Sequence, residues 1–303
     1  MKAIPSYTKV LSLGSAYTED SLTGPVVLQE KLDGSQFSFG LNEDGEIVMR
    51  SKGAVLMEDN YADMFKEAVE YVLSISDIIK RYPKDTYFYT EYLQKPKHNT
   101  LKYKNIPKNH LMLFDVLSEQ KWQERGKMEV AASLFQISVI PELYRGKATV
   151  DSVKSFLTAE SCLGDEIIEG VVIKNYTQTI LLGGHVFPLF TKHVREAFKE
   201  RHAADWGIRQ PKGQLQEFID GFKSEARWKK SILHAKEKGL LTQSPKDIGP
   251  LLKMIQEDIV TEEEENIKRH LFKCFVDDIK RKSVAGFPIW YKDQLLKNVK
   301  ESK

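Results

Sequence analysis

The feature that most constrains this chain is a short turn between two strand-like runs. Val26 to Glu30 is a β-branched run, and Gln36 to Leu41 alternates in the manner of a strand. Between them, residues 31–34 read Lys-Leu-Asp-Gly, which places Lys31 at a strand end before a turn that glycine closes most easily. We therefore expect the Lys31 amine to point into a cleft rather than into solvent.

Up to about residue 200, strand patterns and helical patterns are mixed. Residues 42–45 (Asn-Glu-Asp-Gly) predict a hairpin turn, because Asp-Gly tolerates the positive φ that such turns require. Asp59 to Arg81 has helical spacing and ends before Pro83. Further strands are predicted at Glu46–Arg50, Thr86–Leu93, His110–Leu117, Gly170–Asn175 and Val186–Phe190.

From about Gln210 onward the pattern is helical only. Leu215 to Lys238 reads as one helix closed by Gly239, and residues 244–247 (Ser-Pro-Lys-Asp) read as the start of the next. Residues 261–264 (Thr-Glu-Glu-Glu) read as a second capping box, and Pro288 to Lys300 as a closing helix. We expect a mixed domain over residues 1–206 and a helical domain over residues 207–303.

Composition and charge limit the class of protein. The chain has 303 residues, 41% of them hydrophobic and 29% charged, and its net charge of +2 is too small to coat a nucleic acid. Residues 211–303 hold 19 Lys and Arg against 15 Asp and Glu, a mild excess that an ordinary helical surface explains equally well. Cys162 and Cys274 form no metal or disulfide pattern, and no apolar run approaches a membrane span, so we expect a cytoplasmic protein with no membrane partner.

Several residues that can carry chemistry follow Lys31 in a fixed order. To act as a nucleophile, the Lys31 amine needs a pKa well below its usual value of about 10.4. Each later residue alone could be a strand-end charge or a core aromatic. Their occurrence at strand ends, in this order, is hard to explain as coincidence: Arg50, Glu91, Phe114 with Asp115, Glu169, Lys174 and Lys192.

This ordered set resembles motifs I, Ia, III, IIIa, IV and V of the covalent nucleotidyltransferases, the superfamily of ligases and capping enzymes. It is most similar to the ATP-dependent RNA ligases of the phage nick-sealing RNA ligase 2-like family and the kinetoplastid editing ligases. The resemblance covers roughly residues 25–200 and, more loosely, the tail. It implies an α+β fold: an ATP-grasp-like nucleotidyltransferase domain of antiparallel sheets with flanking helices, followed by an all-α domain.

Three features favour RNA ligases over the rest of the superfamily. Gln36 and Phe37 follow the turn where DNA ligases usually carry arginine. Helices stand where DNA ligases and capping enzymes have an OB-fold barrel. Residues 95–110 also form a basic loop without acids, which suits a polyphosphate or nucleic-acid backbone, although a solvated hairpin would look the same. The lysines of this loop are Lys95, Lys97, Lys102, Lys104 and Lys108.

The resemblance implies a role for each residue near the turn. It makes Lys31 the nucleophile that takes up AMP. Glu30 and Gln36 flank it and help to seat the nucleotide or the RNA end. Asp33 matches the residue of the wider superfamily, whereas the phage enzyme has histidine at this position.

Contacts to the nucleotide are implied farther along the chain. Arg50 contacts the sugar or the nick phosphate, and Glu91 reads the ribose hydroxyl. Phe114 stacks on adenine with Asp115 beside it.

The last motifs are implied to handle metal and phosphate. Glu169 organises the metal, while Lys174 and Lys192 hold the α-phosphate and stabilise its transition-state charge. Motif V usually reads Lys-x-Lys, whereas residues 191–195 read Thr-Lys-His-Val-Arg. Whether Arg195 replaces the missing lysine stays open.

The implied reaction is RNA ligation with ATP and Mg²⁺ (or Mn²⁺). Lys31 takes AMP from ATP, the AMP passes to an RNA 5′-phosphate, and a 3′-hydroxyl displaces it. The partners are RNA with 5′-phosphate and 3′-hydroxyl ends, with the tail binding RNA; an end-healing kinase or phosphatase stays open, and we expect a monomer. The alternatives are an ATP-dependent DNA ligase, a GTP-using capping enzyme, and a non-catalytic RNA-binding module.

Overall fold

The computed structural model describes residues 4–15, 17–56, 63–95, 99–182, 184–199 and 211–292. Their contacts divide the chain into two compact units. The first combines Met1–Lys199 with Glu225–Ile255, and the second combines Glu200–Ser224 with Gln256–Lys303. The domain boundary expected at residues 206 and 207 lies outside the described residues.

Two sheets form the frame of the first unit. The larger has the strand order β5-β4-β3-β6-β7-β8, with β9 beside β7, and the smaller has the order β1-β12-β11-β2-β10. The larger sheet contains β3 (Ser35–Leu41), β4 (Ile47–Ser51), β5 (Val55–Leu56), β6 (Thr86–Tyr92), β7 (Leu111–Ser118), β8 (Lys121–Trp122) and β9 (Ser138–Val139). The smaller contains β1 (Leu11–Ser12), β2 (Pro25–Lys31), β10 (Glu142–Lys147), β11 (Gly170–Leu182) and β12 (His185–Val194). The α+β class with antiparallel sheets is confirmed.

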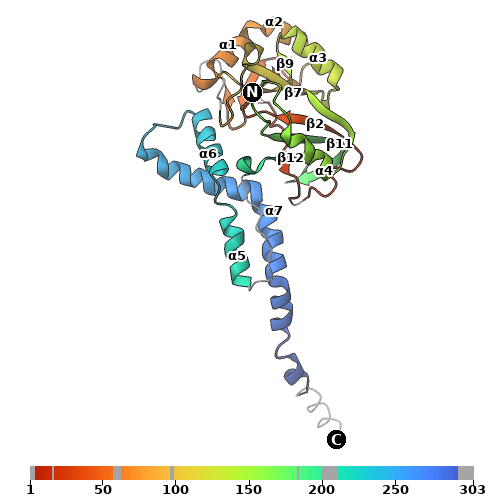
Figure 1. Ribbon diagram of the computed structural model, residues 1–303, viewed down its shortest axis with the longest axis vertical. Coiled ribbons are helices and arrows are strands. Elements are labelled where there is room, and N and C mark those ends of the chain that lie inside the picture. Colours follow the sequence, from red (N-terminus) through yellow and green to blue (C-terminus); the bar gives the residue numbers. More distant parts are fainter. Residues whose placement is uncertain are drawn as a thin grey trace. The chain divides into compact units, whose positions relative to one another are not determined.

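Alternation of side chains along β3 gives the larger sheet two different faces. Phe37, Phe39 and Leu41 belong to the main apolar core together with residues of three helices. These helices are α1 (Lys66–Ser74), α2 (Ser76–Ile79) and α3 (Arg125–Leu134), which group together at the top of Figure 1. The opposite face, which includes Gln36 and Ser38, is therefore free to carry polar side chains.

The smaller sheet has a core of its own. Val26 and Leu28 of β2 and Val171 and Ile173 of β11 pack with Val153 of α4 (Val150–Ser155). α4 lies against this sheet, below the first group of helices, in Figure 1. Strand β2, which ends at Lys31, is therefore held between β11 and β10 by both pairing and packing.

The predicted strands and the hairpin turn at residues 42–45 are confirmed, and the helix predicted from Asp59 is confirmed in part. Residues 59–62 lie outside the described part of the chain, and the helix is interrupted at Ile75, between α1 and α2. Short 3-10 turns add to these elements: η1 (Asp63–Phe65), η2 (Lys108–His110), η3 (Phe156–Thr158) and η4 (Glu196–Phe198).

Helices in the tail differ from the prediction in two places. The single helix predicted over Leu215–Lys238 is wrong, because α5 (Pro211–Asp220) and α6 (Glu225–Glu237) are separate. Gly221 is a poor helix former, and Ser224 is a residue type that favours the position before a helix. Gly239 does follow α6 with a φ of 66°, as expected for a helix end.

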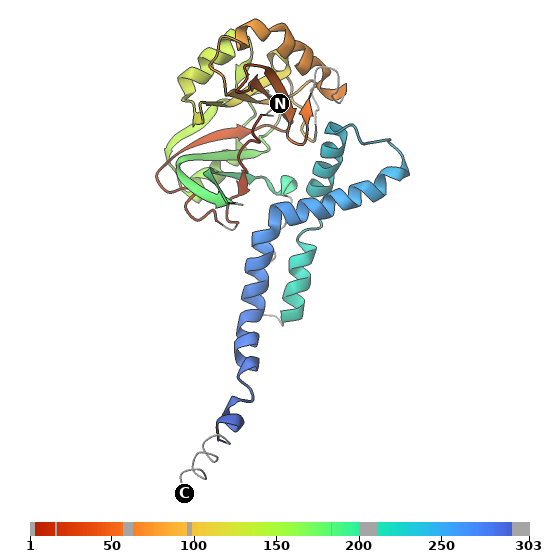
Figure 2. The same cartoon turned by 180° about the vertical axis from the view of Figure 1, so that it is seen from behind.

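The capping box predicted at residues 261–264 is also wrong. One helix, α7 (Ile248–Ser283), runs through this region (Figures 1 and 2). The Thr261 hydroxyl donates to the Glu257 carbonyl at 2.8 Å, so it is satisfied inside a continuous helix. The box predicted at Ser244 is confirmed, with Asp247 as its partner, in η5 (Pro245–Asp247).

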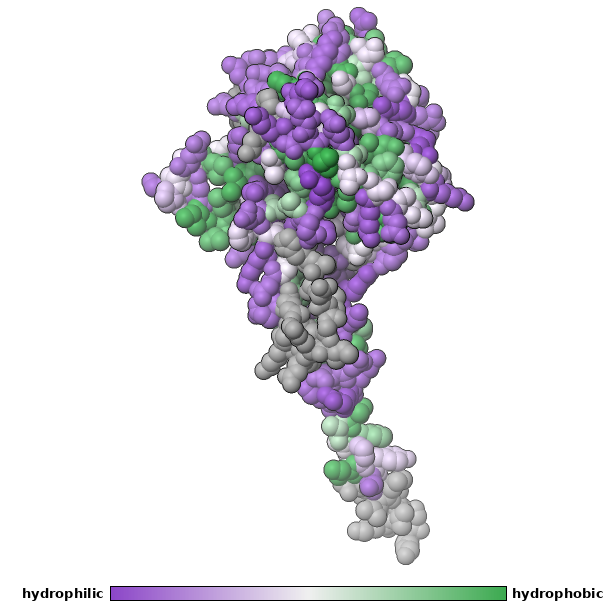
Figure 3. Space-filling view, viewed as in Figure 1, coloured by the Kyte–Doolittle hydropathy of each residue, from purple (hydrophilic) through white to green (hydrophobic). Residues whose placement is uncertain are grey.

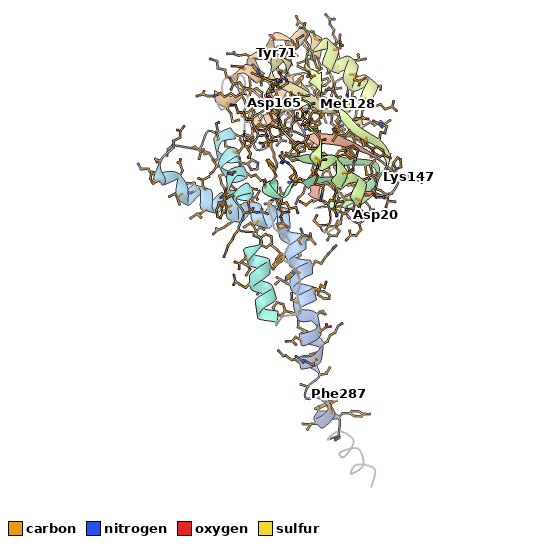
Figure 4. The ribbon with its side chains drawn as sticks, in the orientation of Figure 1. Asp20, Tyr71, Met128, Lys147, Asp165 and Phe287 are labelled. Atoms are coloured by element: carbon orange, nitrogen blue, oxygen red, sulfur yellow. The ribbon has the colours of Figure 1, made fainter. Side chains whose placement is uncertain are left out.

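Beyond α7, residues 287–292 are helical, and the rest of the helix predicted to Lys300 lies outside the described part. Phe287, labelled in Figure 4, is 55% exposed, and hydrophobic residues near it are coloured green in Figure 3. Among the described helices, none is long and apolar enough to cross a membrane.

Candidate active site

Lys31 lies at the last position of β2, opposite Gly170 at the first position of β11. This pairing brings Lys31 beside Glu169, the residue before β11. The Lys31 Nζ donates to Glu169 Oε2 at 2.9 Å, and the two side chains are 28% and 9% exposed. Two residues separated by 138 positions in the sequence thus form an ion pair through strand pairing alone.

Glu91 of β6, in the larger sheet, lies beside the turn that follows Lys31. The Gly34 N–H donates to Glu91 Oε1 at 3.0 Å. A Cβ on Gly34 would lie 2.8 Å from both Glu91 Cγ and the Tyr92 carbonyl oxygen, so only glycine permits this approach. The turn after Lys31 therefore joins the two sheets at the candidate site.

Charges around Lys31 set its protonation state. Burial lowers the pKa of Lys31, but Glu169 and Glu91 together raise it by more than burial lowers it. The resulting pKa lies above the usual value. We expected a lowered pKa for Lys31, as a nucleophile requires. For the protein alone this expectation is wrong. Lys31 is charged and paired with Glu169.

The surroundings also shift the pKa values of the two carboxyl groups beside Lys31. Burial raises the pKa of Glu91 to about 8, and the nearby Glu169 charge raises it too, although Lys31 opposes both. Burial likewise raises the pKa of Glu169, with Asp33 adding to the effect and Lys31 opposing it. Both carboxyl groups therefore hold a proton more tightly than a free glutamic acid does.

The acids that flank Lys31 hold loops. The Glu30 carboxylate accepts hydrogen bonds from the Ser161 hydroxyl at 2.5 Å and from the Cys162 N–H at 2.9 Å. Asp33 Oδ2 accepts from the backbone N–H groups of Thr100 and Leu101, at 2.6 and 2.7 Å. Both carboxylates are buried, so they fix segments that surround the turn.

The basic loop is fastened to the turn by further contacts. The Asp33 N–H donates to the Tyr103 hydroxyl at 2.8 Å, and the Asn99 side-chain amide donates to the Gly34 carbonyl at 3.0 Å. Lys104 pairs with Asp165 at 3.4 Å (Asp165 is labelled in Figure 4). Lys97 of this loop lies outside the described residues.

A β-bulge directs Phe114 toward the Arg50 and Glu91 face of the larger sheet. Tyr89 pairs with Asp115 while the next residue of β6, Thr90, pairs with Leu113, so Phe114 is the extra residue. Its ring stacks on that of Tyr89, with centroids 6.4 Å apart. Such bulges re-aim side chains next to functional sites.

Asp115 and Lys174 join the two sheets through a buried ion pair. Lys174 Nζ donates to Asp115 Oδ2 at 2.8 Å and to the Phe114 carbonyl at 2.7 Å. Asp115 also accepts from the hydroxyls of Tyr7 at 2.6 Å and Tyr176 at 3.1 Å. Burial lowers the pKa of Lys174, and Asp115 partly offsets this.

Gln36 and Arg50 lie on the same face of the larger sheet as Glu91. Gln36 pairs with Glu91 across β3 and β6, and Arg50 is two positions along that face, opposite Ser38. The Gln36 side-chain amide donates to the Ser38 hydroxyl at 3.3 Å. Arg50 Nη1 donates to the Ile4 carbonyl at 2.7 Å.

The two motif V candidates occupy different surroundings. Lys192 pairs with Val172 in the smaller sheet, and its charge lowers the pKa of Glu169. The Arg195 guanidinium donates to the carbonyls of Ile168 at 2.7 Å and Ile167 at 2.9 Å. Lys192 thus acts on the Lys31 cluster, whereas Arg195 holds the segment that precedes Glu169.

The structure adds residues that the sequence reading did not single out as site residues. Tyr176 could have been found, since it is two positions after Lys174 and so on the same strand face. Tyr7 and Ser161 could not, because neither belongs to a strand or helix pattern. Tyr103 lies in the basic loop, and its contact with Asp33 has no sequence signal.

The acidic residues suit a metal that is held mainly by its substrate. Within the described part of the chain, no three His, Cys, Asp or Glu side chains are arranged to hold a metal ion. Glu169, whose carboxylate lies 2.9 Å from the Lys31 amine, could nevertheless contribute one ligand. Magnesium fits such a site, because it binds through one or two carboxylates plus substrate phosphates.

Comparisons with solved structures give relatives at low identity. A Naegleria gruberi RNA ligase solved with pyrophosphate is 14% identical over 65% of this chain and 58% of that chain, with a TM-score of 0.49. A variant of that ligase with ATP and manganese is 13% identical over 65% of this chain and 58% of that chain, with a TM-score of 0.47. An archaeal ATP-dependent RNA ligase is 15% identical over 88% of this chain and 66% of that chain, with a TM-score of 0.45. The chain spans less than two thirds of the length of each.

Comparison with protein families is more specific. No protein of curated function matches the chain in sequence. The RNA ligase family model matches residues 24–189, which is more than half of the chain and includes every motif residue from Glu30 to Lys174. The chain therefore belongs to the RNA ligase family.

Proposed function

We propose that the protein is an ATP-dependent RNA ligase that forms a covalent lysyl-AMP on Lys31. The observation that carries this proposal is the Lys31–Glu169 pair at 2.9 Å, with Glu91 brought beside it from the other sheet. A lysine at the junction of two sheets, surrounded by acids and adjoining an aromatic face, is suited to receive a nucleotide. Membership of the RNA ligase family gives the class of reaction.

In the first step Lys31 attacks the α-phosphorus of ATP. The Lys31 ammonium first gives one proton to solvent, the bond from Nζ to phosphorus then forms as the bond to pyrophosphate breaks, and the second proton leaves the nitrogen for solvent. Mg²⁺ (or Mn²⁺), held by Glu169 and the phosphates, would neutralise Glu169 and let burial lower the pKa of Lys31. Lys192, which already interacts with Glu169, stabilises the charge that develops on the α-phosphate.

Nucleotide binding uses the face of the larger sheet. Glu91 accepts a hydrogen bond from the ribose, and Phe114, re-aimed by the bulge, stacks on the base. Lys174 supports Phe114 through its carbonyl, because the Lys174 side chain is only 2% exposed and its amine is paired with Asp115. We therefore assign direct α-phosphate contact to Lys192 and a supporting role to Lys174.

The remaining steps act on RNA. AMP passes from Lys31 to a 5′-phosphate, and a 3′-hydroxyl then displaces AMP and closes the strand. The position of Arg50 on the same sheet face supports a contact with the strand end. Helices α5, α6 and α7 supply further RNA contacts.

Labelled nucleotides and nicked duplexes test this function. The protein should take up label from ATP and not from GTP, and should seal an RNA nick in preference to a DNA nick. Label from GTP would indicate a capping-type enzyme, and preferential DNA sealing would indicate a DNA ligase. Absence of label from either nucleotide would leave a non-catalytic RNA-binding module.

A further inference from the structure

Residues 4–7 lie across the face of the larger sheet that carries the candidate nucleotide site. Ile4 is 2% exposed and packs with Val48, Tyr87 and Tyr89 on that face. The Ile4 carbonyl accepts from Arg50, and the Pro5 carbonyl accepts from the Tyr89 hydroxyl at 3.2 Å. This segment therefore contacts one of the predicted site residues through its backbone.

Tyr7 contacts aromatic residues of both sheets. Its ring lies edge-on to Phe114 of β7, with centroids 5.0 Å apart, and 5.0 Å from Tyr89 of β6. It is also 6.0 Å from Phe190 of β12, in the smaller sheet. Edge-to-face contacts of this kind fix the orientation of a ring beyond what burial alone achieves.

The Tyr7 hydroxyl acts on the ion pair between the sheets. It donates to Asp115 Oδ2 at 2.6 Å, the same oxygen that receives the Lys174 amine at 2.8 Å. Lys174 in turn donates to the Phe114 carbonyl. Tyr7 thus contacts the ring of Phe114 directly. It also acts on the Phe114 backbone through Asp115 and Lys174.

We propose that Tyr7 is a positioning residue of the adenylation site, and that residues 4–7 are an integral part of that site. By fixing Phe114 and the Asp115–Lys174 pair, Tyr7 sets where the adenine lies and hence where the α-phosphate meets Lys31. Small displacements of a bound substrate are costly, since much of the rate depends on holding the reacting atoms in line. This inference rests on the proposed ATP-dependent reaction.

Substitution of Tyr7 separates its two contacts. Tyr7→Phe keeps the ring and removes the hydroxyl, so the rate of AMP attachment at saturating ATP should fall about tenfold, as for loss of one hydrogen bond to a charged group. Its KM for ATP should change little. Tyr7→Ala removes the ring as well, so its KM for ATP should also rise.

Tyr71→Phe is the matched control. The Tyr71 hydroxyl donates to the Phe135 carbonyl among the helices that cover the opposite face of the sheet (Tyr71 is labelled in Figure 4). With thermal unfolding measured in parallel, Tyr71→Phe should lose stability and keep the wild-type rate per folded molecule and the wild-type KM.

The outcomes are distinct. A Tyr7→Phe protein with the wild-type rate, together with a Tyr7→Ala protein with the wild-type KM, would overturn the inference. Equal effects of Tyr7→Phe and Tyr71→Phe would reduce Tyr7 to a fold-stabilising residue and overturn it as well. If the wild-type protein itself takes up no AMP, the proposed function fails. This outcome is distinct from the others, because they concern the variants only.

Discussion

Residues around Lys31 divide into those that face the reaction and those that hold the site together. Glu30 and Asp33 belong to the second group, because their carboxylates bind the loops at residues 161–162 and 100–101. A loop held by a charged acceptor keeps its shape at low entropic cost when substrate arrives. The turn between the strands is therefore stabilised from both sides of Lys31.

The order of motifs along the chain predicted which residues meet at the site, but not their electrostatics. Lys31, Glu91 and Glu169 come together as expected. The raised pKa of Lys31 was not predictable, because it depends on the sum of burial and carboxylates contributed by distant segments. The role of Tyr7 was hidden for the same reason, since its segment has no periodic pattern.

Arg50 allows a test of how the reaction steps are divided among residues. Arg50→Ala should impair the sealing of pre-adenylated RNA more than it impairs AMP attachment to Lys31, because we propose that the guanidinium contacts the strand end rather than the α-phosphate. The two rates are measured separately, on pre-adenylated RNA and on ATP. Equal losses in both assays would make Arg50 a general structural or ATP-binding residue.

Elements were predictable where a periodic pattern coincided with a clear end. The strands of the larger sheet follow their alternation, and α6 ends at Glu237, just before Gly239. The bulge at Phe114 was not predictable, because β7 is a nearly continuous apolar run in which a one-residue shift of the alternation is not visible. The break between α5 and α6 was missed because apolar spacing continues across residues 221–224.

Helix α6 carries a buried acid that makes the stability of this element depend on pH. Burial raises the pKa of Glu237 to about 7, opposed by the Ser35 hydrogen bond and by Lys52 and Lys238. An acid with a raised pKa binds a proton more tightly in the folded state. Its contribution to stability is fully present below the usual glutamic acid pKa of 4.5 and is lost as pH rises through about 7.

Glu237→Gln should therefore lose less stability than the wild-type protein between about pH 5 and pH 8, and the loss that remains comes from groups such as Glu91, whose pKa is also raised. The urea midpoint at the two pH values measures the difference. Glu225→Gln, on the same helix with a side chain 75% exposed, is the control and should keep the wild-type slope. A wild-type slope in Glu237→Gln would exclude Glu237 as its source.

At the scale of the whole molecule, the positive charge of the tail is not evenly spread. Residues 225–255 hold 7 Lys and Arg against 3 Asp and Glu, whereas residues 256–303 hold 10 of each. The basic part therefore coincides with the helical segment that belongs to the first compact unit. The RNA contacts that we propose for the tail accordingly lie within residues 225–255.

A fragment ending at residue 255 should therefore keep both AMP attachment and RNA binding. Its RNA affinity should fall with salt as steeply as that of the full chain, because the slope counts the phosphates neutralised by Lys and Arg. Titrations at several salt concentrations compare the two proteins. A shallower slope in the fragment would place the RNA contacts beyond residue 255 instead.

The intact mass of the protein after incubation with ATP and Mg²⁺ tests the central claim most directly. The wild-type protein should gain the mass of one AMP, and the added group should map to Lys31. Lys31→Arg should gain nothing, because arginine cannot be deprotonated in proteins. An unchanged wild-type mass, or an AMP adduct on Lys31→Arg, would contradict the account.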